Sequence, residues 1–323
     1  MIVVTGAAGF IGSCLVSRLN ARGQQDLLLV DRFDNDQDPK HKNLAGKKYK
    51  KFLDKEEFLD AVNNDQIAEK IELILHMGAC SSTTLQDADY FEQNNFVYSC
   101  RLAQWAERKG ARLIYASSAA TYGDGSAGYS DEASALRRLR PLNLYGQSKQ
   151  KFDEWILAQG FIDHVVGLKF FNVFGPNEYH KGDMQSVVAK AYARVVSEGK
   201  TSLFKSYKKE YADGEQKRDF IYIKDTLEVI LFFVDHPSLG GIFNVGTGQA
   251  RSWNDLAQSL FAAVGKTPRI EYIPMPETLK ERYQYFTQAD IRNLRKAGFR
   301  KPFLSLEDAV KDYAGYLKSH KYF

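Results

Sequence analysis

Thr5-Gly6-Ala7-Ala8-Gly9-Phe10-Ile11-Gly12 is the stretch that decides the fold of this 323-residue chain. It follows an apolar run, Met1 to Val4, that is typical of a short buried strand, and it precedes a helical pattern from Ser13 to Arg22. Gly6 permits a tight turn, Gly9 lets the backbone approach a pyrophosphate, and Gly12 allows the helix to pack closely on the strand. Strand, glycine turn and helix in this order predict the first unit of a dinucleotide-binding Rossmann fold.

An acidic residue follows the second predicted strand of this unit. The apolar run Asp26-Leu27-Leu28-Leu29-Val30 ends at Asp31, where a carboxylate can accept a hydrogen bond from a ribose hydroxyl. Arg32 and Lys40 lie on the same predicted loop, and a guanidinium there suits a ribose 2′-phosphate. We therefore expect NADP as the cofactor. NAD is the alternative if Arg32 only balances the neighbouring acids.

Beyond this unit, strands alternate with helices in the way that builds a parallel sheet covered on both faces. The pattern predicts strands at 71–75, 112–116 and 165–176, and a long helix at 94–109. After residue 176 it loosens, with helices at 186–198, 225–235, 253–264 and 306–318. We predict an α/β fold in which a doubly wound parallel Rossmann sheet and a smaller, mostly helical substrate-binding C-terminal lobe share the chain. The proposed division assigns 1–171 and 218–246 to the sheet domain, and 172–217 and 247–323 to the lobe.

A tyrosine and a lysine four residues apart, Tyr145 and Lys149, indicate proton transfer. On a helix these side chains share one face, so we expect the ammonium to lower the pKa of the phenol and make it a usable base. The strand at 112–116 delivers Ser117 and Ser118 to its carboxyl end, where ligands bind in open α/β sheets. We expect Ser118 to hydrogen-bond the reacting oxygen, with Ser117 as the competing choice because neighbouring strand residues face opposite ways. Lys149 would also bind the nicotinamide ribose.

Composition excludes several classes of protein. Lysine and arginine number 44 against 40 acidic residues, and the basic clusters are interspersed with acids and aromatic residues, so we expect no nucleic-acid partner. Cys14, Cys80 and Cys100 show neither a pattern of disulfide pairing nor the spacing of metal ligands, so no metal is expected. No apolar run approaches the ~18 residues of a membrane span. We expect a cytoplasmic enzyme with no membrane partner.

Five motifs in this order resemble the extended short-chain dehydrogenase/reductase family of nucleotide-sugar enzymes. They are the glycine turn at 5–12, Ser117-Ser118-Ala119-Ala120-Thr121-Tyr122-Gly123, Tyr145-x-x-x-Lys149, Phe171-Asn172-Val173-Phe174-Gly175-Pro176, and Arg218-Asp219-Phe220-Ile221-Tyr222-Ile223-Lys224-Asp225. Within the family, three more stretches resemble the branch that inverts carbon 6 of an ADP-activated heptose for lipopolysaccharide core synthesis: Gly78-Ala79-Cys80-Ser81-Ser82-Thr83-Thr84, Glu178-Tyr179-His180-Lys181-Gly182, and Arg282-Tyr283-Gln284-Tyr285-Phe286-Thr287-Gln288-Ala289-Asp290. The resemblance implies an ADP-heptose substrate, bound NADP and a homo-oligomer.

The implied chemistry requires two acid/base groups. Carbon 6 of such a heptose carries no acidic C–H, so inversion requires transient oxidation to a ketone and return of the hydride to the opposite face. The hydroxyl points in different directions in the two epimers, so one base cannot easily serve both. Tyr145 is the first candidate, and Lys181 is the second. The alternative interpretation of Lys181 is a lysine that binds a diphosphate or lies on the surface.

The predicted site residues fall into three sets. The catalytic set is Tyr145, Lys181, Ser118 and Lys149. The cofactor set is Gly6, Gly9, Phe10, Ile11, Gly12, Asp31, Arg32, Lys40, Lys55, Met77, Gly78, Ala79, Cys80, Ser81, Asn94, Tyr145, Lys149 and Val173. The substrate set is Ser118, Asn172, Lys181, Asp183, Lys190, Phe204, Lys205, Arg218 and Tyr283.

Other functions stay open at this stage. A UDP-sugar 4-epimerase or a nucleotide-sugar dehydratase would share the fold and the Tyr145 and Lys149 pair, although Ala119 and Ala120 offer a dehydratase no acid pair. A non-catalytic dinucleotide sensor is the alternative from another class. The chain also departs from the family at Met77, at Asp183 and in the long charged segment 207–216, which bears on substrate choice.

Overall fold

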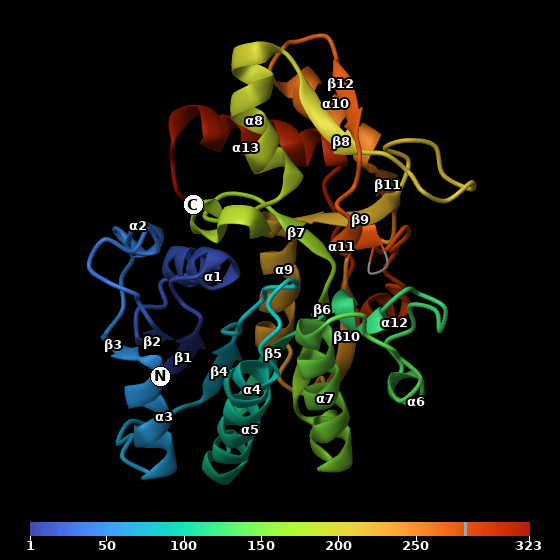
Figure 1. The fold of residues 1–323 in the computed structure, drawn as a ribbon. Helices are drawn as coiled ribbons and strands as arrows, with labels where there is room; N and C mark the ends of the chain where they lie inside the picture. Colours follow the sequence, from blue (N-terminus) through green and yellow to red (C-terminus); the bar gives the residue numbers. More distant parts are fainter. Residues whose placement is uncertain (281–282) are drawn as a thin grey trace.

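The computed structural model describes residues 1–280 and 283–323, in which seven parallel strands form the central sheet in the order β10-β6-β5-β4-β1-β2-β3. Figure 1 shows this sheet in the lower half of the molecule, with helices on both of its sides. Its strands are β1 (Ile2–Thr5), β2 (Leu27–Asp31), β3 (Lys51–Asp54), β4 (Leu73–His76), β5 (Arg112–Ser118), β6 (Val166–Phe170) and β10 (Gly241–Val245).

Successive apolar residues of each strand point to opposite sides, so the sheet has two apolar faces. On β1, Val4 packs into a core with helix α1 (Phe10–Ala21) and helix α9 (Ile223–Asp235), while Val3 packs into a separate core on the other face. Helices that cover this second face are α3 (Lys55–Asn63), α5 (Tyr98–Lys109) and α7 (Leu144–Ala158). Because successive strand residues point to opposite faces, near-continuous apolar strands are buried on both sides, and the predicted doubly wound α/β fold is confirmed.

The C-terminal half adds a second layer above the carboxyl end of the sheet (Figure 1). Here β9 pairs in parallel with β7 and antiparallel with β11, and β8 pairs in parallel with β12. Helices α8, α10 and α13 pack against one another, α10 lying along α13. The bounds are β7 (Asn172–Phe174), α8 (Val187–Glu198), β8 (Thr201–Phe204), β9 (Lys217–Tyr222), β11 (Ala250–Ser252), α10 (Trp253–Ala263), β12 (Ile270–Ile273) and α13 (Leu306–Ser319).

Short helices fill the connections. They are α2 (His41–Leu44), α4 (Ala88–Phe91), α6 (Ala133–Leu136), α11 (Glu277–Lys280) and α12 (Arg292–Lys296). No helix in the described part of the chain is long and apolar enough to cross a membrane. The division into a sheet domain and a substrate lobe stays a prediction, and α9 packs on α1 of the nucleotide unit as that division requires.

The predicted helix at 94–109 differs from the structure at its start. A π-helical turn, Glu92–Val97, precedes α5, and the Asn95 side chain lies within it. Its amide accepts a hydrogen bond from the Cys80 N–H at 2.9 Å and donates to the Cys80 carbonyl at 2.9 Å. Such widened turns recur at functional sites, and this one fixes the loop after β4.

His76 joins three elements beneath that loop. Its Nδ1 lies 2.6 Å from Thr5 Oγ1 on β1, and its Nε2 lies 2.8 Å from Ser99 Oγ on α5. Burial lowers the pKa of His76 to about 3, and the Lys149 charge adds to that shift. The folded protein therefore keeps this imidazole neutral at a pH where an unfolded chain would protonate it.

The pH dependence of unfolding tests this assignment. An unfolded histidine titrates near 6.5, so His76 removes stability as the pH falls from about 6.5 toward 3. In His76→Gln, the free energy of unfolding in urea should fall less steeply between about pH 7 and pH 5, by up to about 1.4 kcal/mol per pH unit. Equal slopes for the variant and the wild type would contradict the assignment.

Candidate active site

A cavity of about 420 Å³ lies at the carboxyl ends of β1, β4 and β5. Every residue that the sequence analysis assigned to the cofactor lines it, and so do Ser118 and Lys181. These residues come from positions as distant in sequence as Gly6 and Val173. The fold thus brings the predicted cofactor and catalytic residues into one space, which is the position expected for a ligand in an open α/β sheet.

The glycine turn leaves no room for a side chain at Gly6 or at Gly12. Gly6 has a φ of +66°, and a Cβ there would lie 2.6 Å from the Cα of Gly78 on the loop after β4. A Cβ on Gly12 would lie 2.0 Å from the Gly6 carbonyl oxygen. The helix and the β4 loop both approach the turn at backbone contact distance, and this open cradle fits the pyrophosphate of a dinucleotide.

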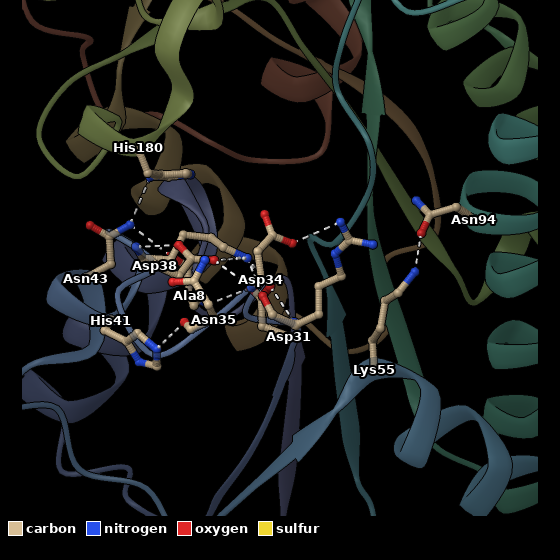
Figure 2. A network of polar contacts seen from close by, with 12 residues as sticks. Ala8, Asp31, Asp34, Asn35, Asp38, His41, Asn43, Lys55, Asn94 and His180 are labelled. Atoms are coloured by element: carbon tan, nitrogen blue, oxygen red, sulfur yellow. Dashed lines mark hydrogen bonds and ion pairs between the residues drawn. The ribbon is translucent and has the colours of Figure 1, made fainter. Parts of the chain in front are cut away.

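Asp31 anchors a polar network beside the turn (Figure 2). Its carboxylate accepts hydrogen bonds from the Ala8 N–H at 2.8 Å and the Arg32 N–H at 2.8 Å, and it lies 3.2 Å from Lys40 Nζ. Across the cavity wall, Lys55 Nζ donates to Asn94 Oδ1 at 2.6 Å. One carboxylate and three cations, Arg32, Lys40 and Lys55, therefore line the same end of the cavity.

Tyr145 and Ser118 face each other at the other end. Tyr145 is half-buried in the first turn of α7, and burial raises the pKa of its phenol more than the Ser118 hydroxyl lowers it. Ser117, by contrast, donates to Asp153 Oδ2 at 2.7 Å on the opposite face of β5. The alternation of the strand thus leaves Ser118 beside the phenol, which favours it over Ser117 for the predicted role.

The prediction that the pKa of Tyr145 is lowered is wrong. Burial raises the pKa of Tyr145, and the Ser118 hydroxyl only opposes that rise. Burial also lowers the pKa of Lys149 to about 8, because its ammonium lies in the core, where Nζ donates to the Ala116 carbonyl at 2.8 Å. Sequence spacing placed the pair on one helix but did not account for the cost of burying charge.

A buried ion pair holds β5 on the face opposite Ser118. Lys169 Nζ on β6 lies 2.6 Å from Asp153 Oδ2 on α7, and both side chains are 0% exposed. The Asp153 carboxylate also accepts hydrogen bonds from the Tyr115 hydroxyl at 2.8 Å and from Ser117. One carboxylate therefore joins β5, β6 and α7, the elements that carry Ser118, Tyr145 and Lys149.

Lys181 reaches the cavity from a different part of the fold. It lies in the 3-10 turn Tyr179–Met184, and its Nζ lies 5.3 Å from the centre of the Phe10 ring in the glycine turn. Burial lowers the pKa of Lys181, Glu178 opposes the shift and Lys190 adds to it. A partly desolvated lysine in this cavity gives up a proton more readily than a free lysine does.

A second cavity of about 720 Å³ includes Arg218 and Tyr283 in its lining. The Arg218 guanidinium is 6% exposed and lies 5.1 Å from the Tyr283 ring centre and 5.8 Å from that of Trp253. Thr83 and Thr84, from the loop that lines the first cavity, also line this one. A guanidinium held between aromatic rings suits a diphosphate.

Five residues of the predicted substrate set line neither of these cavities: Asn172, Asp183, Lys190, Phe204 and Lys205. Asp183 and Lys190 are exposed and contact each other, since Lys190 Nζ donates to the Asp183 carbonyl. Their roles stay predictions. Arg282, at the start of one family stretch, lies outside the described residues.

The structure adds lining residues that sequence reasoning missed. They are Thr5, Val30, Tyr90, Tyr98, Ala116, Phe170, Phe171 and His180. Most lie at or near the carboxyl end of a strand, and that position alone signals them. In the described residues no group of three or more histidine, cysteine or acidic side chains is arranged to hold a metal ion.

Comparison with known proteins agrees with this geometry. Residues 2–246 match the model of a family described as NAD dependent epimerase/dehydratase. The chain belongs to the NAD dependent epimerase/dehydratase family. A nicotinamide dinucleotide is accordingly the cofactor class of this family, and the cavity contains the glycine cradle that it requires.

Within the NAD dependent epimerase/dehydratase family, three similar proteins share one name. ADP-L-glycero-D-manno-heptose-6-epimerase from Nitratidesulfovibrio vulgaris is 50% identical over 313 residues, 97% of this chain and 96% of that protein. The protein of the same name from Fusobacterium nucleatum is 45% identical over 322 residues, again 97% and 96% of the two chains. The crystal structure of the Helicobacter pylori enzyme of that name has a TM-score of 0.84 at 29% identity, covering 98% and 96%.

A substitution at Gly12 tests the close contact in the cradle. In Gly12→Ala the new methyl would collide with the Gly6 carbonyl, so we expect a loss of about 1–3 kcal/mol in unfolding free energy and at least tenfold weaker dinucleotide binding. Thermal unfolding and nicotinamide fluorescence titration measure the two effects. The matched control is Gly315→Ala in α13, where a Cβ meets nothing within 4 Å and both properties should be retained. Normal binding by Gly12→Ala would contradict the cradle.

Proposed function

We propose that this protein is an ADP-glyceromanno-heptose 6-epimerase, an isomerase that interconverts ADP-D-glycero- and ADP-L-glycero-D-manno-heptose with NADP bound. The observation that carries the proposal is the placement of Tyr145 and Lys181, from separate elements, in one cavity. The similarity to enzymes of this name extends over 97% of the chain.

Inversion at this carbon proceeds through oxidation. A bound nicotinamide would supply reversible hydride transfer at carbon 6, with no net redox change. One protein base would remove the hydroxyl proton as the carbon–oxygen double bond forms. After rotation of the ketone, the opposite protein group would return a proton to the oxygen.

The protein groups divide this work. Tyr145 exchanges the proton on one side, and the neighbouring Ser118 hydroxyl would donate a hydrogen bond to the ketone oxygen. Lys149, 4% exposed, lies one turn after Tyr145 on α7, donates its ammonium to the Ala116 carbonyl and would bind the nicotinamide ribose. Lys181 exchanges the proton on the other side, where burial keeps its pKa below that of a free lysine.

The cations around Asp31 favour NADP over NAD. Asp31 suits a ribose hydroxyl, but both of its carboxylate oxygens already accept hydrogen bonds, one from Ala8 and the other from Arg32 and Lys40. The guanidinium of Arg32 pairs with the exposed Asp34 at 3.1 Å. A 2′-phosphate would compete for this guanidinium and for the ammonium groups of Lys40 and Lys55, which line the same cavity. The ADP end of the substrate would then occupy the second cavity, with its diphosphate on Arg218. We expect a homo-oligomer located in the cytoplasm.

Direct assay decides between this function and its alternatives. Purified protein is incubated separately with ADP-D-glycero-D-manno-heptose, with a UDP-hexose and without sugar, and the products are followed by proton NMR. We expect inversion at carbon 6 of the heptose alone. Epimerisation of the UDP-hexose alone would identify the 4-epimerase function, and dinucleotide binding with no turnover of either sugar would identify a sensor.

Two substitutions test the paired bases. Tyr145→Phe and Lys181→Met should each lower kcat for inversion by at least about 100-fold, because each removes the proton acceptor on one side of the ketone. Both variants should keep NADP bound and retain their far-ultraviolet circular dichroism. If Lys181→Met turned over at the wild-type rate, the two-base scheme would be wrong even if the substrate assignment held.

A third substitution tests cofactor choice. Arg32→Ala removes one charged contact to a 2′-phosphate, which should weaken NADP binding about 10- to 100-fold and leave NAD binding nearly unchanged. The matched control is Lys50→Ala, which removes an exposed cation that pairs with Asp26 outside the cavity. Equal losses for both cofactors in isothermal titration would argue against a 2′-phosphate site.

A further inference from the structure

The loop that carries Lys181 is closed by a buried carboxylate. We call residues 175–186 the Lys181 loop. Glu178 is 0% exposed and accepts hydrogen bonds from the N–H of Ser186 at 2.7 Å and from its hydroxyl at 2.6 Å. It also accepts a longer bond, 3.4 Å, from the Gly175 N–H. One side chain thus ties the two ends of the loop together.

Within the loop, Asn177 has an uncommon backbone conformation and bonds to elements outside the loop. Its φ is +74°, a region that costs a non-glycine residue energy, and it is 0% exposed. Its amide nitrogen donates to Ser13 Oγ on α1 at 2.9 Å, and its amide oxygen accepts from the Phe323 N–H at 2.7 Å. A buried residue keeps such a conformation only where surrounding contacts enforce it.

Residues 321–323, which we call the strap, supply those contacts from the far end of the chain. The Asn177 amide nitrogen also lies 3.3 Å from the Phe323 carbonyl, to which Lys47 Nζ donates at 2.7 Å. Tyr179 of the Lys181 loop donates its hydroxyl to the Lys321 carbonyl at 3.0 Å, and its ring meets that of Tyr322 edge-on at 5.1 Å. The strap therefore contacts the loop at two residues, both within four positions of Lys181.

The opposite side of the loop is tied to the glycine turn. Asn43 is 1% exposed, and its amide nitrogen lies 2.8 Å from the Ala8 carbonyl, 3.1 Å from the Asn177 carbonyl and 3.2 Å from His180 Nδ1. Figure 2 shows this amide between His180 and the nucleotide unit. The Lys181 loop is thereby joined to the same turn that cradles the cofactor.

We propose that Asn177 and the strap position Lys181: together they hold the Lys181 loop against helix α1 so that the ammonium keeps its place over Phe10 in the cofactor cavity. Neither Asn177 nor the strap lines that cavity, so both act through Lys181 and are positioning elements. The inference rests on the proposed function in so far as Lys181 is the second acid/base group. The contacts of Asn177 and the strap that hold the Lys181 loop, which we call the clamp, do not depend on the substrate.

Two variants remove the clamp from its two sides. Asn177→Gly tolerates the positive φ and deletes the amide, and deletion of residues 321–323 removes the strap. We expect each to lower kcat for inversion about 10- to 100-fold, as misplacement of a catalytic group by about 1 Å does, with KM and NADP affinity nearly unchanged. The double variant should lose less than the product of the two single losses, because Asn177 and the strap share the contact between Asn177 and Phe323.

Two further readouts separate positioning from general destabilisation. Backbone amides at 178–184 should exchange with deuterium faster in both variants, while amides of β1 and β5 are unchanged. The pH limb of kcat that is lost in Lys181→Met should move to higher pH, because loosening admits water to a lysine whose pKa burial lowers. The controls are Asp65→Gly, another residue with positive φ, and Ser319→Ala at the end of α13, both of which should behave as wild type.

Each outcome decides a separate point. Equal exchange at 178–184 in the wild type and the variants would overturn the clamp. Faster exchange with an unchanged kcat and pH limb would show that the clamp does not position Lys181, and would overturn the inference while the proposed function stands. If the wild-type protein does not invert carbon 6, the proposed function fails, and the exchange data alone then decide whether the strap holds the loop.

Discussion

The buried pair between Asp153 and Lys169 is the interaction on which the site depends. Neither charge reaches water, so each requires the other, and breaking such a pair costs about 3–5 kcal/mol. Because the same carboxylate binds Tyr115 and Ser117, the pair fixes β5 against β6 and α7. The proposed chemistry takes place one residue further along the strand, on the face turned away from the ion pair. A charged core here sets the position of Ser118 and the helix of Tyr145.

The other half of the site is organised by backbone contact rather than by charge. At the glycine turn, three backbone segments approach so closely that side chains are excluded at Gly6 and Gly12. Helix α1 leaves this turn and, through Ser13, reaches the loop of Lys181. Tyr145 and Lys181 therefore belong to two separately supported parts of the fold that meet across one cavity.

Local chemistry made much of this visible in the sequence. Glycine spacing, an acid after the second strand, and a tyrosine and lysine four residues apart each have a meaning independent of the rest of the chain, and the residues that they indicated line one cavity. The π-helical turn around Asn95, the strand β3 and the contacts of Asn177 depend on partners distant in sequence, and no local pattern reveals them. The direction of the Tyr145 pKa was missed for the same reason, since burial is a property of the whole fold.

The loop after β4 borders both cavities, and its short backbone limits the distance between them. Ser81 lines the first cavity and Thr83 the second, so two residues of backbone, at most about 7 Å, separate their walls. A ligand that fills both spaces must be elongated, with its reacting carbon at a set reach from its charged end. Under the proposed function one nucleotide sugar occupies both cavities, and this loop would then fix the distance between its reacting carbon and its diphosphate.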